Sequence, residues 1–295
     1  MDIKIKTTPD FNFKRTAASH GWSELLPFKI DDKWSKLTRV VDVGANRKPV
    51  NVEITGAKGA LRVSVAGELS PAAVDKIRRD VRHMLRLDDP LADFYAAVAK
   101  EPAFAWVAGA GAGRLLRAPT VFEDLVKTIC TTNCSWSLTR TMVTRLVENL
   151  GRPARGGGRS FPNAAALAEA PLSFFRDEMR SGYRAPFFKE LADRVASGEL
   201  DVEGWLTSEL PTAELKRAMK QVKGVGDYAA ENLLKLVGRY DVLALDSWVR
   251  STYARLHNQG RAAADKKIAR HYARFREWRG LALWCDMTKD WIEEK

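Results

Sequence analysis

The sequence predicts an α+β fold in which a small antiparallel β-sheet precedes a larger, all-helical region. Two patterns lead to this prediction. Within residues 50–65, apolar and polar residues alternate on both sides of a glycine turn, which is typical of a β-hairpin. Beyond about residue 90, apolar residues recur at helical spacing, and the connections are short and contain Gly or Pro. We therefore expect a β-rich domain over residues 1–88 and a helical domain over residues 89–295.

Each element follows from a local signal. In the hairpin, apolar residues stand at positions 50, 52 and 54 and again at 61, 63 and 65, around a Gly-Ala-Lys-Gly turn at 56–59. Ser70 can cap a following helix that has Pro71 in its first turn. Further helices are expected over Leu91–Ala99, Phe122–Cys130, Leu138–Leu150, Ala164–Ala170, Phe187–Ala196, Leu215–Val222, Tyr228–Val237, Ser247–Arg255 and Ala264–Trp278.

Charge narrows the class of partner. The chain has 295 residues, with 48 Lys and Arg against 37 Asp and Glu, for a formal net charge of +11. This excess favours an anionic partner, with nucleic acid ahead of an acidic membrane surface. No uncharged apolar run approaches the ~20 residues that a membrane-spanning helix requires. The N-terminus also lacks the apolar core of a signal peptide, so we expect a protein that stays inside the cell, either cytoplasmic or nucleoid-associated.

The cysteines exclude two further classes. Cys130, Cys134 and Cys285 are too few for a disulfide framework, and they cannot supply the four thiolates of a zinc or iron–sulfur site. Cys130 and Cys134 lie four residues apart, where two small buried side chains are favoured over a metal site. No cofactor and no catalytic metal are expected.

A glycine turn between two predicted helices is the most informative local feature. One helix ends near Lys223, the segment Gly224-Val225-Gly226 forms a tight turn, and Asp227 can cap the next helix. Two glycines one residue apart let the backbone approach a ligand closely. The following helix N-terminus presents unpaired N–H groups and a positive dipole end, which together suit an anion such as a phosphate. The turn alone also fits an ordinary helix–helix connection.

A single carboxylate follows this turn in an unusual setting. Asp246 ends the apolar run Val242–Leu245 and precedes a helix that is predicted to begin at Ser247. The dipole of that helix would hold the carboxylate ionised. Capping of the helix is the simpler alternative for Asp246.

Several ordered motifs together resemble the helix-hairpin-helix DNA glycosylases, and within that superfamily the 8-oxoguanine and 3-methyladenine DNA glycosylase branch. The resemblance covers nearly the whole chain. It implies a helix-hairpin-helix glycosylase domain over the helical region. Five motifs carry it. They are Arg114-Leu-Leu-Arg117 before Phe122-Glu-Asp-Leu, the run Ile129–Asn133, Gly182-Tyr-Arg-Ala185, the helical hairpin around Gly224-Val225-Gly226 that is followed by Asp246, and Trp278-Arg-Gly280.

The resemblance implies an enzyme of base-excision repair. Such an enzyme flips a damaged, oxidised or alkylated purine out of duplex DNA and hydrolyses its N-glycosidic bond. Asp246 matches the catalytic aspartate, which either stabilises the oxocarbenium-like sugar or deprotonates the attacking water. The expected partner is double-stranded DNA that contains a damaged base. No membrane partner is expected, and the protein is expected to be a monomer. The resemblance also allows a monovalent ion that bridges the hairpin carbonyls and a DNA phosphate.

The residue at the lyase position departs from the bifunctional members of the superfamily. They carry a Schiff-base lysine two residues after the second glycine of the hairpin, where this chain has Tyr228. A phenol cannot form that imine, so a monofunctional glycosylase is expected. Two alternatives stay open: a bifunctional 8-oxoguanine glycosylase and lyase that uses another amine such as Lys223, and a non-catalytic helix-hairpin-helix module that binds DNA.

Three residues match positions that contact the distorted duplex. Asn133 matches the gap-filling asparagine, Tyr183 the wedge against the opposite strand, and Arg184 a residue that bonds to the estranged base. Without the resemblance, Asn133 would be interpreted as a helix cap and Tyr183 as part of the core. Leu138 stands where cytosine-requiring enzymes have a second arginine, which argues against strict pairing with cytosine.

The resemblance also implies a base pocket, with loosely aligned residues. Aromatic faces there suit a flipped purine, including a cationic alkylated one, and Asp286 could accept from an exocyclic donor. Helix packing explains the same residues equally well. The residues expected around the base are Trp248, Leu283, Trp284, Asp286 and Met287, with His20 and Trp22 approaching from the N-terminal domain.

Overall fold

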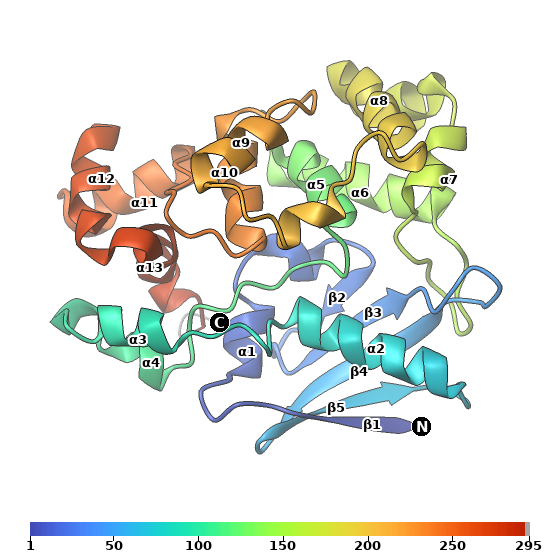
Figure 1. Ribbon diagram of the computed structural model, residues 1–295, viewed down its shortest axis with the longest axis horizontal. Helices are drawn as coiled ribbons and strands as arrows, with labels where there is room; N and C mark the ends of the chain where they lie inside the picture. The colour runs from blue at the N-terminus through green and yellow to red at the C-terminus, as the bar shows by residue number, and fades with distance from the viewer. Residues whose placement is uncertain (293–295) are drawn as a thin grey trace.

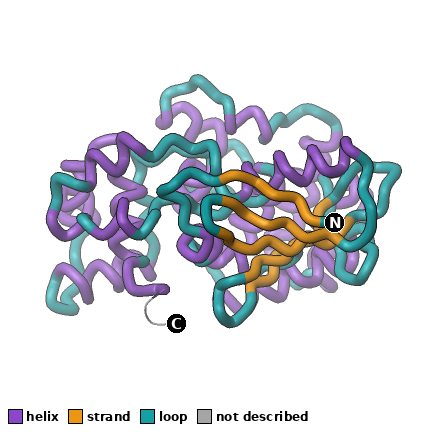
Figure 2. The backbone as a smooth tube through the Cα atoms, turned by 90° about the horizontal axis from the view of Figure 1, so that it is seen from below, coloured by secondary structure: helices purple, strands orange, loops and turns teal. Residues whose placement is uncertain are grey.

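The computed structural model describes residues 1–292 and contains one antiparallel sheet followed by helices, so the predicted α+β class is confirmed (Figure 1). The sheet has five strands in the order β1-β5-β4-β3-β2. It lies to one side of the molecule, and helices fill the rest (Figure 2). The strands are β1 (Asp2–Lys6), β2 (Phe28–Ile30), β3 (Lys36–Val41), β4 (Val50–Ala57) and β5 (Ala60–Val65).

Most helices follow the predicted ranges, but α1, α4 and α13 were not predicted, and one predicted helix is interrupted. The predicted helix over 264–278 ends as an α-helix at Tyr272 and continues as 3₁₀ turns, in which Arg276 has a φ of 49°. Within residues 1–292, no helix is both long and apolar enough to cross a membrane. The α-helices are α1 (Phe13–Ala17), α2 (Pro71–Met84), α3 (Ala92–Val98), α4 (Trp106–Gly109), α5 (Val121–Thr131), α6 (Trp136–Leu150), α7 (Ala164–Glu169), α8 (Ala185–Ala196), α9 (Thr212–Met219), α10 (Asp227–Leu236), α11 (Ser247–His257), α12 (Asp265–Tyr272) and α13 (Arg279–Met287).

One face of the sheet is buried because its apolar residues alternate. Val52 and Ile54 of β4 lie on this face beside Val63 of β5, and all three are buried. Helix α2 runs along the sheet and contributes Ile77 and Val81 to the same core (Figure 1). Ser70 caps α2 as predicted, because its hydroxyl accepts from the backbone N–H of Ala73.

The apolar residues form two cores that do not divide the chain at residue 88. The first core joins the sheet and α2 to helices α5, α6 and α8 to α10. The second core joins α3 and α4 to the residues from Tyr240 to Met287, which include α11 to α13. The chain thus leaves the first core near Leu87, enters the second, returns, and leaves again after Leu236. The boundary between residues 88 and 89 stays a prediction.

A buried ionic cluster joins the sheet to the helices. Arg39 of β3 holds both carboxylate oxygens of Glu123 on α5, with Nη1 at 2.9 Å and Nη2 at 2.5 Å. The ammonium of Lys127 lies 2.7 Å from the same carboxylate, and all three side chains are at most 3% exposed. Burial by itself would raise the pKa of Glu123, but the charges of Arg39 and Lys127 hold it below its ordinary value.

The substitution Glu123→Gln should destabilise the fold by about 3 kcal/mol or more, because it leaves two buried cations without their carboxylate. Urea unfolding monitored by circular dichroism measures this change. The matched control is Glu53→Gln, which removes an exposed pair with Lys36 and should change stability by about 0–1 kcal/mol. Because the pKa of Glu123 is lowered on folding, its stabilisation is complete at neutral pH and is lost as the pH falls through its folded pKa. Equal losses in the two variants at pH 7 would contradict this account.

Candidate active site

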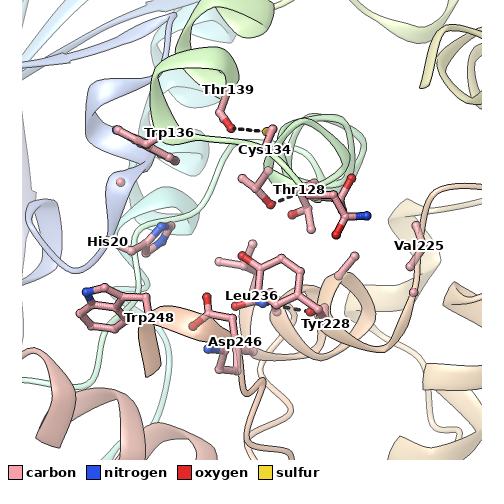
Figure 3. Close-up of a pocket in the computed structure, with 18 of the residues that line it drawn as sticks. His20, Thr128, Cys134, Trp136, Thr139, Val225, Tyr228, Leu236, Asp246 and Trp248 are labelled. Atoms are coloured by element: carbon pink, nitrogen blue, oxygen red, sulfur yellow. Dashed lines mark hydrogen bonds between the residues drawn. The ribbon is translucent and has the colours of Figure 1, made fainter. Parts of the chain in front are cut away.

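A cleft of about 1540 Å³ opens where the two cores meet. Its walls come from the segment between α1 and β2, the end of α5, the turn between α9 and α10, and the start of α11. Figure 3 shows Asp246 and Tyr228 across the cleft from Thr128 and Cys134.

The turn between α9 and α10 has the geometry that its glycines predict. Gly224 has a φ of +87°, and a Cβ added there would lie 2.9 Å from the ring of Phe187. Helix α10 begins with Gly226 as its N-cap and no capping side chain, so its first N–H groups have no side-chain partner. Such a terminus suits an anion, as expected of a segment that meets a phosphate.

Asp227 does not cap α10, which corrects the sequence-based prediction. Its carboxylate instead pairs with Lys216 and Lys220 of the preceding helix, at 3.0 Å each. The bonds to Lys220 and Lys216 hold the pKa of Asp227 below its ordinary value. Lys223 is exposed and pairs with Glu190 at 2.6 Å. These bonds rigidify the hairpin and leave its glycine backbone open to the cleft.

Asp246 both caps a helix and lines the cleft. Its Oδ1 accepts from the backbone N–H of Val249 at 2.6 Å, so it is the N-cap of α11. Its carboxylate points into the cleft (Figure 3). The capping alternative and the cleft position are therefore compatible, because one oxygen suffices for the cap.

Glu231 fixes the loop that leads to Asp246. Its Oε2 accepts from the backbone N–H of Ala244 at 2.9 Å, and Ala244 is held at a φ of 52°. The other oxygen of Glu231 lies 2.5 Å from the ammonium of Lys216. One carboxylate on α10 thus joins α9 to the loop that positions Asp246.

Tyr228 occupies the first turn of α10 and lines the cleft. Burial raises the pKa of the phenol above its ordinary value, and the nearby Asp246 carboxylate adds to this shift. The Thr131 side chain on α5 lies close enough to the phenol to lower its pKa, but burial outweighs this effect. The group is therefore neutral at physiological pH, and this position holds no amine.

Asn133 and Tyr183 lie together at the rim of the cleft. The amide of Asn133 donates to the Tyr183 hydroxyl at 3.4 Å. Asn133 lies between the end of α5 and the N-cap of α6, with a φ of 46°, so it caps neither helix. Tyr183 is 57% exposed, which excludes the core alternative. Leu138 is half-buried on α6.

Arg184 is not among the described residues that line the cleft. Its guanidinium is buried and donates to Thr132 through the side-chain hydroxyl, at 3.2 Å from Nε, and through the backbone carbonyl. It also lies over the ring of Tyr183, 4.5 Å from the ring centroid. In this structure its donors hold the loop that carries Asn133, and a contact of Arg184 with an estranged base stays a prediction.

Three tryptophans form an aromatic wall in the cleft. The rings of Trp248 and Trp284 are 5.7 Å apart, and Trp291 lies 5.5 Å from Trp248 and 5.9 Å from Trp284. The indole N–H of Trp284 donates to the backbone carbonyl of Ser19 at 2.8 Å. This bond fixes the wall against the N-terminal segment.

Leu283, Asp286 and Met287 do not line the cleft, which corrects the expected base pocket. Leu283 and Met287 are buried in the second core. Asp286 accepts from Tyr272 at 2.6 Å and contacts His257 at 2.8 Å, on another side of α13. The cause is helical geometry, because successive residues turn by about 100° and only Trp284 faces the wall.

The sequence interpretation missed Lys235 and named His20 and Trp22 without a role. All three line the cleft. Trp22 is fixed by its indole N–H, which donates to the buried Asp124 at 2.7 Å. Lys235 could have been found from its setting, since it is a lone charge in the apolar run from Leu233 to Leu236, seven residues after Tyr228.

The substitution Gly224→Ala should reduce stability by about 1–3 kcal/mol, because an L-residue is strained at this positive φ and its methyl group would press on Phe187. Gly226→Ala is the control, since Gly226 has a φ of −85° and open space around it. The control should be near neutral. Thermal unfolding measures both, and equal destabilisation would contradict the assigned turn geometry.

Comparisons with known proteins agree with this architecture. No family model matches the sequence. A curated relative from Methanothermobacter thermautotrophicus, a "Probable N-glycosylase/DNA lyase", is 23% identical over 88% of this chain and 86% of its own length. The structure of a 3-methyladenine DNA glycosylase from Archaeoglobus fulgidus superimposes with a TM-score of 0.75 over 98% of both chains, at 20% identity. An 8-oxoguanine glycosylase/lyase from Clostridium acetobutylicum gives a TM-score of 0.73 at 18% identity, over 97% of this chain and 95% of its own.

The fold is therefore that of the helix-hairpin-helix DNA glycosylases, with the hairpin at α9–α10 and a carboxylate at the following helix N-terminus. The resemblance to the 8-oxoguanine and 3-methyladenine branch, predicted from the sequence motifs, is confirmed.

Proposed function

We propose that this protein is a DNA glycosylase of base-excision repair that hydrolyses the N-glycosidic bond of a damaged purine in duplex DNA. The observation that carries the proposal is the Asp246 carboxylate, which points into an aromatic cleft directly beside the hairpin turn. A carboxylate in that place suits the positive charge that develops on the sugar as the bond breaks. It also repels phosphate, so a module that only binds DNA would be served as well by an uncharged helix cap such as Asn or Ser.

The surrounding residues support a division of roles. The hairpin residues Lys223 to Asp227 hold the DNA backbone. A monovalent ion at the hairpin carbonyls would bridge them to a DNA phosphate. Asn133 fills the gap left by the extruded base, and Tyr183 wedges against the opposite strand, since both are exposed at the rim. Trp248 and Trp284 stack on the base in the cleft. Asp246 either stabilises the oxocarbenium-like sugar or deprotonates the attacking water.

We expect Asp246→Asn to lower base release by about 10²–10⁴-fold, the range for loss of a general base. Asparagine caps helices as well as aspartate, so the variant should keep its stability. The assay uses duplexes that carry 8-oxoguanine, 3-methyladenine, 1,N6-ethenoadenine, hypoxanthine or uracil, with strand cleavage measured after hot alkali. Asp75→Asn makes the same chemical change at an exposed position on α2 and should retain full activity. Full activity in Asp246→Asn would overturn its role, whereas duplex binding without base release from any substrate would favour the non-catalytic module.

We further propose that the enzyme is monofunctional, because Tyr228 replaces the lyase amine. Wild-type protein should give strand breaks only after alkali and no covalent complex when borohydride is added during the reaction. Tyr228→Lys should restore an amine at this position and give a borohydride-trapped complex, while Tyr228→Phe should not. Trapping of the wild-type protein would instead support the lyase alternative, and loss of the trapped complex in Lys223→Met or Lys235→Met would identify the amine.

A further inference from the structure

A buried lysine beside Asp246 has no partner that explains it. Lys235 lies two turns after Tyr228 on the same face of α10, lines the cleft and is 3% exposed. Within residues 1–292, its ammonium makes no hydrogen bond or ion pair and lies over the Trp284 ring, 4.4 Å from the ring centroid. A buried charge is costly unless it is paired. The position therefore indicates a ligand that accepts from the ammonium.

Neither nearby carboxylate bonds to the Lys235 ammonium in the described residues, although the charges of both act on it. Glu231 bonds to Lys216 and to the backbone N–H of Ala244, and Asp246 caps α11. Burial lowers the pKa of Lys235 to about 8, while the charges of Asp246 and Glu231 oppose the shift. The side chain is therefore mainly protonated at neutral pH, so it acts as a donor.

His20 supplies the complementary acceptor. Its Nε2 lies 2.5 Å from the backbone carbonyl of Leu116, and because a carbonyl only accepts, Nε2 carries the proton. Burial, with the nearby charge of Lys235, lowers the pKa of His20 to about 3 although the Leu116 carbonyl opposes the shift. The ring is thus neutral, and Nδ1 is an acceptor with no bonded partner among residues 1–292.

The two groups border the same aromatic wall. Trp284 carries the Lys235 ammonium over its ring and donates its indole N–H to Ser19, the residue before His20. Figure 3 shows His20 above Trp248 and Asp246 on one side of the cleft. A donor, an acceptor and a stacking face therefore line the same cleft as the Asp246 carboxylate.

From this arrangement we propose that Lys235 and His20 determine specificity: they select a neutral base that presents a ring carbonyl beside a ring N–H. The ammonium donates to the carbonyl, Nδ1 accepts from the N–H, and the tryptophans stack on the ring. The fixed positive charge disfavours a base that is itself cationic, such as an N-alkylated purine. This inference rests on the proposed glycosylase function, and among the oxidised and alkylated purines expected from the sequence it selects the neutral ones that carry a carbonyl.

The test compares base release from matched duplexes. 8-Oxoguanine and hypoxanthine are neutral and carry the carbonyl and N–H pair, 7-methylguanine carries the pair but is cationic, and 1,N6-ethenoadenine is neutral without a carbonyl. We expect kcat/KM for the two neutral carbonyl bases to exceed that for 7-methylguanine by at least about tenfold, the effect of one hydrogen bond to a charged group. Lys235→Met keeps an apolar stem against Trp284 and should remove this preference, while release of 7-methylguanine is unchanged or faster.

Two further variants and one pH profile make the assignment specific. Lys223→Met, at the exposed hairpin lysine, should weaken all substrates alike and leave their ratios unchanged. His20→Gln keeps a donor for the Leu116 carbonyl but removes the Nδ1 acceptor, so it should reduce release of the carbonyl bases only. In wild-type protein, kcat/KM for 8-oxoguanine should fall as the pH rises through about 8, and Lys235→Met should lack this decline.

The outcomes separate this inference from the function on which it rests. If no duplex loses its base, both proposals fail. If bases are released but 7-methylguanine is processed as fast as 8-oxoguanine, or Lys235→Met leaves the ratios unchanged, only this inference fails. A rate that increases with pH, together with a borohydride-trapped complex that Lys235→Met abolishes, would make Lys235 a nucleophile and overturn its role as a donor.

Discussion

The ionic cluster between Arg39 and the first turns of α5 determines how the two parts of the site meet. One carboxylate serves two cations there, and the ring of Phe28 lies 4.3 Å from the Arg39 guanidinium carbon and 4.9 Å from the Lys127 ammonium. The next residue on the helix, Asp124, holds the indole of Trp22 and the backbone N–H of Ala118. The beginning of α5 therefore fixes the N-terminal segment, while its end lines the cleft at Thr128 and Thr131. These contacts on α5 therefore fix the position of His20 relative to the hairpin between α9 and α10.

A second constraint acts on the opposite wall. Glu231 links α9, α10 and the loop before Asp246 through one carboxylate. Gly280, at the start of α13, contacts the same loop so closely that an added Cβ would lie 1.9 Å from the carbonyl of Val242. The orientation of Asp246 thus depends on the Glu231 carboxylate, on backbone packing and on a helix cap. This leaves its second oxygen available for a ligand.

Local signals in the sequence were sufficient to predict the helical hairpin at α9–α10, the strands β4 and β5 and the main helices. Each of these depends on periodicity or on glycine within a short window. They were not sufficient for Arg184 or Asp286, whose partners, Thr132 and His257, come from other elements. A lone carboxylate in an apolar run identified Asp246. The same criterion, applied to cations, would have identified Lys235. What no local pattern contains is the pairing of Lys235 with Trp284 and of His20 with Leu116, since these residues are 49 and 96 positions apart.

The two cores have a consequence for the order in which the molecule is built during translation. The second core needs residues near Phe94 and Phe104 together with residues beyond Tyr240, and the chain between them belongs to the first core. The fully buried residues of the first core are all synthesised by Leu236, so this core can assemble while the C-terminal helices are still inside the ribosome. Trp248 and Trp284 join only afterwards. The core that holds the hairpin can therefore be complete before Trp284 leaves the ribosome, whereas the aromatic wall requires nearly the whole chain.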